Sequence, residues 1–137
     1  MIQNIDYAPT FLEMAGAPVP KDIQGVSLLP LLQGKSPSDW RTSIYYHYYE
    51  YPSVHMVPQQ CGIRTERYKL IHFYQFDEWE LYDLANDPDE LANLYNNPEQ
   101  APQIATLKKQ LADLQAFYED DSDLAVKPKA WQQQYRK

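Results

Sequence analysis

The chain has 137 residues, 44% of them hydrophobic and 23% charged, a composition typical of a globular domain long enough to bury a core. The formal net charge of −7 argues against nucleic-acid binding, because a surface that follows phosphates needs clustered Lys and Arg. The single cysteine excludes an internal disulfide framework and a cysteine-based zinc site. The sequence contains no apolar run long enough to span a membrane. Its first residues have neither the basic nor the apolar region of a signal peptide.

Residues 4–16 are predicted to form a short helix that begins at Asp6 and ends at Gly16, because Asp is favoured at helix N-termini and Gly at their C-terminal ends. One face of this helix is apolar, and a helix of three turns cannot bury that face alone. A proline-rich connector follows over 18–34 and includes a leucine-rich helical turn. The polar segment 35–39 is the predicted boundary between two subdomains, residues 1–35 and 36–137.

Four segments alternate large and polar side chains or are rich in the aromatic residues that favour strands. They are residues 43–51, 62–64, 68–73 and 79–84. A connection from Thr65 to Tyr68 is short enough for a hairpin. The last three segments are therefore predicted to form an antiparallel meander, with the first segment in the same sheet. The residues from Asn86 to Asp89 favour a turn, and a helical segment is expected after it.

The clearest helical pattern lies between Pro102 and about Tyr118, where apolar residues recur at intervals of three and four. These residues are Ile104, Leu107, Leu111, Leu114 and Tyr118. A helix with one apolar stripe packs against a sheet with one apolar face. The sequence therefore predicts an α+β fold: a four-stranded antiparallel sheet packed by one long C-terminal amphipathic helix, preceded by a short helix and a proline-rich connector. The tail is predicted to be extended, with Trp131 as an anchor.

No combination of side chains matches a catalytic or metal-binding motif. The three histidines lie far apart, and His47 and His72 fall within predicted strands, where a structural role is expected. Cys61 at the start of a strand is expected to be a small buried apolar residue. An acidic cluster near residue 85 lacks the spacing of a calcium loop and is expected to form turns and a helix N-terminus; it comprises Asp83, Asp87, Asp89 and Glu90. His55 differs because it lies in the proline-bounded loop 52–60, and loops concentrate function.

Four segments carry a family resemblance, in order along the chain. They are NIDYAPTFLEMAG (4–16), PKDIQGVSLLPLL (20–32), GIRTERYK (62–69) and ELYDLANDPDELANL (80–94). Together they resemble the C-terminal end of the type I sulfatases of the alkaline-phosphatase-like superfamily. The resemblance implies that residues 1–35 are the last part of an α/β catalytic domain. Residues 36–137 would then form a smaller α+β subdomain that closes over the active site.

The resemblance implies that the parent protein is a sulfuric ester hydrolase and that this chain closes its active site. The loop 52–60 is the expected wall of the substrate pocket, with His55, Gln59 and Gln60 as polar contacts to a sulfated sugar or aryl sulfate. The expected partner is the missing catalytic domain. The resemblance is compatible with a periplasmic or secreted parent.

Departures from the family pattern indicate that this chain alone does not hydrolyse sulfate esters. The family converts a Cys or Ser in a C/S-x-P-x-R motif to formylglycine, and the segment CGIR (61–64) lacks the proline. The family's calcium ligands lie in the catalytic domain, and no matching motif is present here. No catalytic or metal-binding residue is therefore expected, and calcium and formylglycine are expected only in a full-length parent. Related sequences often have a basic residue and a His where this chain has Gln59 and Gln60, which leaves the substrate class open.

Two other functions are compatible with the residues. A free-standing carbohydrate-binding module would present an exposed row of Tyr45, Tyr49 and Tyr51. A self-association module would use apolar residues near the N-terminus as its interface. These residues are Ile5, Leu12, Leu28, Leu29, Leu31 and Leu32. The resemblance alone accounts for all four segments.

Overall fold

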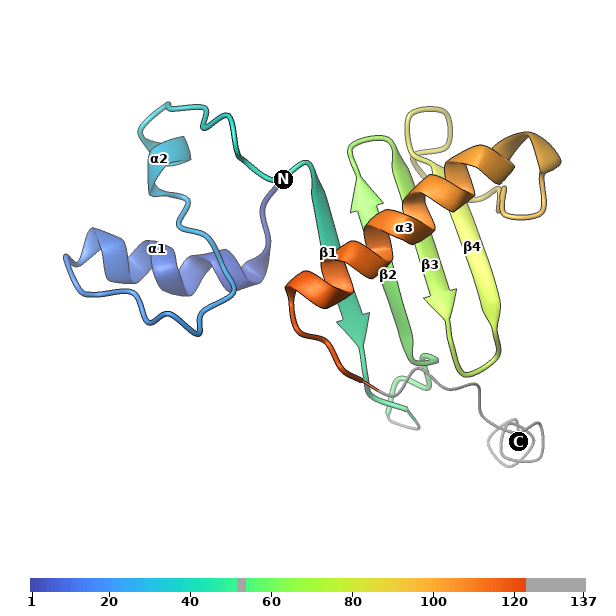
Figure 1. Ribbon diagram of the computed structural model, residues 1–137, viewed down its shortest axis with the longest axis horizontal. Coiled ribbons are helices and arrows are strands. Elements are labelled where there is room, and N and C mark those ends of the chain that lie inside the picture. Colours follow the sequence, from blue (N-terminus) through green and yellow to red (C-terminus); the bar gives the residue numbers. More distant parts are fainter. Residues whose placement is uncertain (52–53, 123–137) are drawn as a thin grey trace. The chain divides into compact units, whose positions relative to one another are not determined.

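A computed structural model describes residues 1–51 and 54–122 (Figure 1). These residues form two compact units, the first ending at Ile44 and the second beginning at Tyr45. The first unit contains a 3-10 helix η1 (Asn4–Asp6) and the helices α1 (Tyr7–Met14) and α2 (Leu29–Leu32). The strands are β1 (Ser43–Tyr48), β2 (Gln60–Thr65), β3 (Tyr68–Phe73) and β4 (Glu78–Asp83). The first two residues of β1 belong to the first unit. The 3-10 helix η2 (Pro98–Gln100) and α3 (Ala101–Phe117) follow. The predicted anchor Trp131 lies outside the described residues.

The ends of α1 lie close to the predicted positions, but Asp6 does not cap the helix with its side chain. Its carboxylate instead accepts the backbone N–H groups of Gln3 at 2.7 Å and Val26 at 2.9 Å. The same carboxylate pairs with both terminal nitrogens of Arg41, at 2.8 and 2.7 Å. Both oxygens are therefore committed to other parts of the first unit. Gly16 follows α1 with a φ of 67°, the left-handed conformation that glycine adopts without strain.

The connector segment 25–28 is held against the start of α1. The Thr10 hydroxyl accepts the N–H of Leu28 at 2.8 Å. A Cβ at Gly25 would lie 2.0 Å from the carbonyl oxygen of Ile5, so only glycine permits this close approach. Asp6, Thr10 and Gly25, which belong to the first two resembling segments, therefore have a structural role: they join α1 to the connector.

The first unit extends beyond the boundary predicted at residue 35. The indole N–H of Trp40 donates to the carbonyl of Met1 at 2.8 Å, and Arg41 pairs with Asp6 as described above. These bonds hold residues 40 and 41 to the N-terminal segment, which accounts for a unit that ends at Ile44.

The four strands form one antiparallel sheet in the order β1-β2-β3-β4, as predicted. Ile63 on β2 lies opposite Leu70 on β3, and Leu70 lies opposite Leu81 on β4. Because side chains alternate between the two faces of a strand, these three residues share one face. Each is fully buried, so they form the centre of the core.

The helix α3 crosses this apolar face of the sheet (Figure 1). Leu107 and Leu111 are buried in the core cluster, and the other three residues of the predicted stripe, Ile104, Leu114 and Tyr118, pack against it. The predicted amphipathic helix is therefore confirmed, with bounds within one residue of those expected. None of the helices in the described part of the chain is long and apolar enough to cross a membrane.

The opposite face of the sheet carries Tyr46 on β1 beside Gly62 on β2. A Cβ at Gly62 would lie 2.4 Å from the Tyr46 hydroxyl and 2.7 Å from the carbonyl oxygen of Leu70. The tyrosine side chain thus occupies the space above the glycine. Replacing Gly62 with any larger residue would displace the tyrosine ring or the strand.

The helical segment expected after the turn at Asn86 is absent, and residues 84–97 form turns and irregular backbone instead. Backbone and side-chain bonds to β4 prevent a helix there. The N–H of Leu81 donates to the side chain of Asn93 at 3.1 Å, and the N–H of Leu94 donates to the carbonyl of Leu81 at 2.8 Å. Because β4 is an edge strand, this segment satisfies backbone groups that would otherwise be exposed. Asn93 and Leu94, at the end of the fourth resembling segment, therefore protect the sheet edge.

Candidate functional site

Residues 54–60 lead into β2 and contain all three predicted contact residues. His55 lies in a turn next to Val54 and is exposed. Three apolar side chains surround it in sequence: Val54, Met56 and Val57 are 93%, 48% and 37% exposed. Met56 has a φ of 49°, which is uncommon for a residue other than glycine. The loop therefore presents an imidazole among exposed apolar groups.

Gln59 and Gln60 are half-buried at the end of this loop. The side-chain amide of Gln59 donates to the carbonyl of Tyr49, and its oxygen accepts an N–H from Gln75 at 2.6 Å. Gln60 is the first residue of β2. Among the described residues, no hydrogen bond joins either glutamine to His55. The structure thus places the three predicted residues in one loop without a hydrogen bond from either glutamine to His55.

A buried polar cluster that the sequence analysis missed lies where β1 ends. The Nδ1 of His47 lies 2.7 Å from an oxygen of Asp120, and its Nε2 lies 3.0 Å from the hydroxyl of Tyr74. The Tyr45 hydroxyl donates to the same oxygen of Asp120. The side chains of His47 and Asp120 are only 2% and 7% exposed. The cluster ties β1 to the segment after α3.

The charges in this cluster follow from its hydrogen bonds. Burial alone would raise the pKa of Asp120, but hydrogen bonds from Ser122, Tyr45 and His47 outweigh burial and hold that pKa well below its usual range. Burial and the bond to this carboxylate raise the pKa of the Tyr45 phenol. At neutral pH the cluster therefore contains an ionised Asp120 and a neutral Tyr45. Because the cluster is closed to solvent, its arrangement indicates a structural role.

Cys61 has the properties of a core residue, as expected. It is 1% exposed and belongs to the core cluster. Burial, and next the negative charge of Asp120, raise the pKa of its thiol to about 12. The thiolate is the nucleophilic form of cysteine, so this residue is not poised to attack a substrate.

The acidic cluster near residue 85 does not fit a calcium ion. Asp83 pairs with the Arg67 guanidinium at 2.9 and 2.7 Å, and Asp87 accepts two backbone N–H groups at 3.1 and 2.9 Å. Glu90 pairs with Lys69 at 2.5 Å. These carboxylates are thus committed to protein groups. Over residues 1–51 and 54–122, no group of three or more His, Cys, Asp or Glu is arranged to hold a metal ion.

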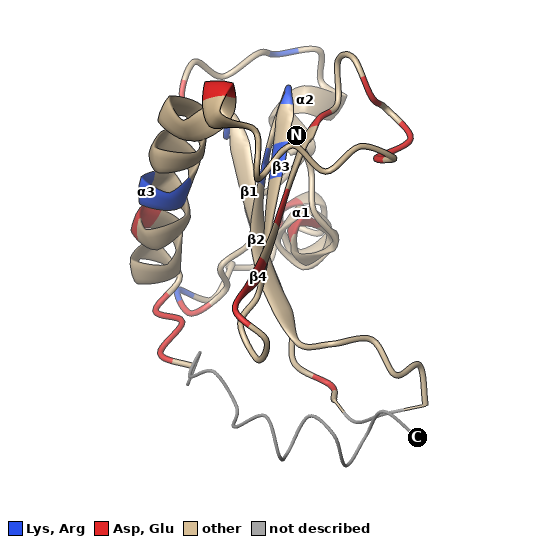
Figure 2. Cartoon of the chain, turned by 90° about the vertical axis from the view of Figure 1, so that its right-hand side faces the viewer, with Lys and Arg blue, Asp and Glu red and all other residues tan. Residues whose placement is uncertain are grey.

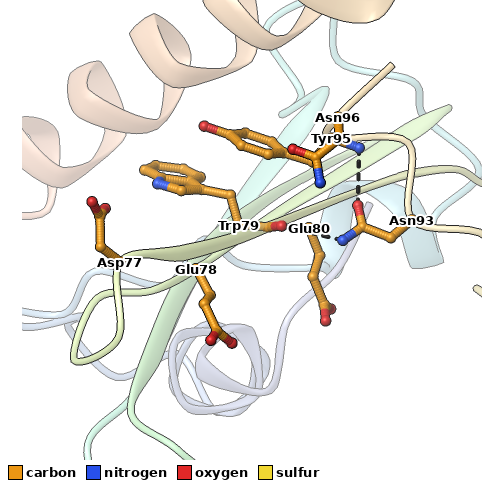
Figure 3. A pocket seen from close by; sticks show the side chains of 7 residues that line it. All are labelled: Asp77, Glu78, Trp79, Glu80, Asn93, Tyr95 and Asn96. Carbon is orange, nitrogen blue, oxygen red and sulfur yellow. Dashed lines mark hydrogen bonds between the residues drawn. The ribbon is translucent and has the colours of Figure 1, made fainter. Parts of the chain in front are cut away.

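A hollow of about 340 Å³ lies beside β4 at the edge of the sheet (Figure 3). The ring of Trp79 stacks on Tyr95 at 5.9 Å and on His72 at 3.8 Å. The side chains of Glu78 and Glu80 point away from the two labelled rings (Figure 3). Ligand sites have polar groups that converge on the ligand, and these diverge. The two glutamates therefore do not combine with the rings into one polar site.

The aromatic row expected of a carbohydrate-binding module is absent. Tyr45 is 8% exposed and stacks on Tyr118, which follows α3, at a centroid distance of 6.1 Å. Tyr49 is exposed, but Tyr51 is half-buried. Because one of the three rings lies beneath the helix, the three cannot form one exposed platform.

The apolar residues predicted for self-association are not all available at the surface. Leu28 is buried. Leu12, Leu29 and Leu31 are half-buried, and Ile5 and Leu32 are exposed. Leu28 packs within the fold and is not available at the surface. A different apolar stripe is exposed along α1, where Tyr7, Phe11 and Met14 are 52%, 65% and 61% exposed.

Comparisons with known proteins agree with this fold. A family model described as N-sulphoglucosamine sulphohydrolase, C-terminal, matches residues 1–117. The chain belongs to this family of sulfatase C-terminal domains. An N-acetylglucosamine-6-O-sulfatase from Bacteroides thetaiotaomicron is 51% identical over 121 residues, which are 86% of this chain and 22% of that protein. A Δ4,5-hexuronate-2-O-sulfatase from the same organism is 32% identical over 121 residues, 86% of this chain and 24% of that protein.

A solved structure extends the agreement to three dimensions. A protein in complex with its substrate, D-glucosamine-2-N,6-O-disulfate, matches 87% of this chain with a TM-score of 0.82 and 49% sequence identity, over 25% of its own length. The chain thus spans a quarter or less of the length of these three proteins. The resemblance inferred from the four segments is therefore confirmed.

Sequence reasoning did not identify the hydrogen-bond partners of Gln59 and His47. Gln75 and Asp120 bind residues 16 and 73 positions away in sequence, at Gln59 and His47. Neither Gln75 nor Asp120 lies at a sequence spacing from its partner that would predict the hydrogen bond. Alternation along β1 did place Tyr45 and His47 on one face, which is the only part of the buried cluster that the sequence indicated.

Proposed function

We propose that this chain is the C-terminal part of a sulfatase that hydrolyses a sulfate ester of a sugar. The observation that carries the proposal is the match of residues 1–117 to the sulfatase family, supported by 51% identity to an N-acetylglucosamine-6-O-sulfatase. A sulfated amino sugar is accordingly the first substrate class to test. The chain's own role in this proposal is to close the active site and to form one wall of the substrate pocket.

The proposed partner is the remainder of the parent protein, an α/β catalytic domain. Residues 1–35, with the rest of the compact unit that ends at Ile44, would be its last part, and the residues that follow would be the smaller subdomain. The exposed stripe of Tyr7, Phe11 and Met14 on α1 supports this proposal, because large apolar side chains at this spacing are normally covered. A dimer of this chain through the same stripe is the competing arrangement. Light scattering of the isolated chain, compared with the same chain carrying Phe11→Glu, tests whether the stripe self-associates.

The proposed pocket wall is the loop of residues 54–60. His55 and Gln60 would contact the sugar, with Gln59 in the same loop. The segment from Thr42 to Ile63 contains no Lys or Arg. Acidic residues outnumber basic ones, 19 to 12, along the whole chain, and Figure 2 colours the charged residues of the described part. The loop would therefore contact hydroxyl or amide groups of the substrate. Neutralising the sulfate would be left to the rest of the parent.

Catalysis would belong to the rest of the parent. Sulfatases generally use calcium and a formylglycine, which together provide charge stabilisation and the nucleophile. This chain fits neither group, because the Cys61 thiol is buried and protonated and the carboxylates near residue 85 are paired with protein groups. The isolated chain should accordingly show no turnover of an aryl sulfate in the presence of calcium.

The test is made in the full-length protein that carries this segment, with N-acetylglucosamine-6-sulfate and a small aryl sulfate as substrates. His55→Ala should lower kcat/KM for the sugar about 2–10-fold, the loss expected for one hydrogen bond. The aryl sulfate should be affected less, because it extends less far toward the loop. Gln110→Ala is the matched control, since Gln110 is exposed on α3. Absence of sulfatase activity in the full-length protein would refute the proposed function, and unchanged kinetics of His55→Ala on every sulfate ester would refute the role of the loop.

A further inference from the structure

Gln59 connects three segments that are separate in sequence. Its amide nitrogen donates to the backbone carbonyl of Tyr49, immediately after β1, and its amide oxygen accepts from Gln75, in the turn between β3 and β4. Gln75 is 1% exposed, so its position is fixed by the protein around it. The bonds of Gln59 thereby fasten the base of the loop 54–60 to the sheet.

The chemistry of this connection requires an amide at position 59. One side-chain group must donate to a carbonyl and accept from an N–H at the same time, and a glutamine amide does both. A carboxylate would accept from Gln75 but would face the carbonyl of Tyr49 without a proton to donate. A lysine would donate to Tyr49 but would leave the amide of Gln75 without its acceptor, and unpaired buried polar groups are costly.

We propose that Gln59 is a positioning residue, which closes the base of the loop 54–60 and, held there by Gln75, fixes the direction in which His55 and Gln60 face a sugar substrate. This inference rests on the proposed function for its substrate but not for the connection itself. Fixing a loop before binding lowers the conformational entropy lost when the ligand binds. The amide of Gln59 therefore acts through the loop and does not contact the sugar.

The connection is tested first in the 137-residue chain by ¹⁵N relaxation of the backbone amides of residues 54–57. Gln59→Glu removes the donor and keeps the acceptor, whereas Gln75→Leu removes the opposite partner. Each should lower the order parameters of the loop from about 0.85 toward about 0.6, with the chemical shifts of β2 and β3 unchanged. The double variant should be no more mobile than either single variant, because both changes release the same connection.

Controls separate this effect from general loosening. Gln110→Glu adds the same charge on the exposed side of α3 and should leave the loop unchanged. If Gln75→Leu shifts the whole spectrum, Gln59→Met takes its place, because methionine has a similar length but neither an N–H donor nor an oxygen acceptor. Loop order parameters that stay at the value of the unmodified chain in a folded Gln59→Glu or Gln59→Met variant would overturn the connection.

The positioning role is tested in the full-length protein that carries this segment. Gln59→Met should raise KM for N-acetylglucosamine-6-sulfate at least threefold, leave kcat within twofold, and leave turnover of a small aryl sulfate unchanged. Gln59→Asn should raise KM for the sugar as Gln59→Met does, because its amide is one methylene too short to reach both Tyr49 and Gln75. A mobile loop with unchanged KM would overturn the positioning role. A full-length protein without sulfatase activity would instead refute the proposed function, and the relaxation data would still decide whether the connection exists.

Discussion

The ion pair between Asp6 and Arg41 is predicted to be a main source of stability of the first unit. The Asp6 side chain is fully buried and that of Arg41 is 12% exposed. Replacing Asp6 with Ala removes both bonds to the guanidinium and leaves Gln3 and Val26 without their acceptor. Breaking a buried pair by removing one partner costs about 3–5 kcal/mol. A loss of that size is a large part of the total stability of about 5–15 kcal/mol that is typical of a domain.

The assay is urea unfolding followed by circular dichroism, combined with hydrogen exchange of the Leu28 amide. This amide is bonded to the Thr10 hydroxyl within the first unit and keeps that acceptor when Asp6 is replaced. Asp6→Ala and Arg41→Ala should each be strongly destabilising, and the double variant should be less destabilised than the sum of the two, because it leaves no unpaired charge. Glu13→Ala, an exposed residue on α1, is the control and should change stability by less than about 0.5 kcal/mol. A loss below about 1 kcal/mol in Asp6→Ala, the value for exposed pairs, would refute the reasoning.

The same pair predicts a dependence of stability on pH. Burial alone would raise the pKa of Asp6, but the bonds from Arg41, Val26 and Gln3 outweigh burial and lower it. The unfolded chain then takes up a proton more readily than the folded one, so the contribution is fully present above about pH 4, the ordinary pKa of Asp. It is lost as the pH falls through the lower pKa of the folded state. The stability difference between the unmodified chain and Asp6→Ala should therefore shrink on acidification below about pH 4, and a difference that is constant with pH would contradict the assignment.

Two further predictions concern the core and the sheet. Leu107→Ala should lower the free energy of unfolding by about 2–5 kcal/mol, because Leu107 is 0% exposed in the core cluster. Urea unfolding measures this loss. A loss no larger than that of the surface change Gln110→Ala would contradict the packing. Tyr46→Phe should leave stability unchanged or raise it by up to about 1 kcal/mol, because the buried Tyr46 hydroxyl has no hydrogen-bond partner among the described residues; a clear loss in a thermal melt would show that the hydroxyl is bonded.

The sequence determined the elements whose signals are local. The recurrence of Leu107 and Leu111 with their neighbours on one helical face predicted α3 and its buried side, because a helix repeats every 3.6 residues whatever it packs against. Alternation predicted that Tyr45 and His47 share a face of β1, and the short connection at Thr65 predicted the hairpin. The order of the four resembling segments identified the sulfatase family. The loop that carries His55 was also evident, since prolines bound it.

Tertiary structure decided what each polar group binds. Asp6 has the sequence position of a helix cap, but its carboxylate is taken by Arg41, 35 residues away. The segment after Asn86 has residues suited to a helix start, but hydrogen bonds to β4 keep it irregular. Gln59 lies in the loop that is predicted to contact a substrate, and its amide is bonded to Gln75 and Tyr49. A hydrogen bond needs only the right atoms within about 3 Å in space, and such a partner leaves no periodic trace in the chain.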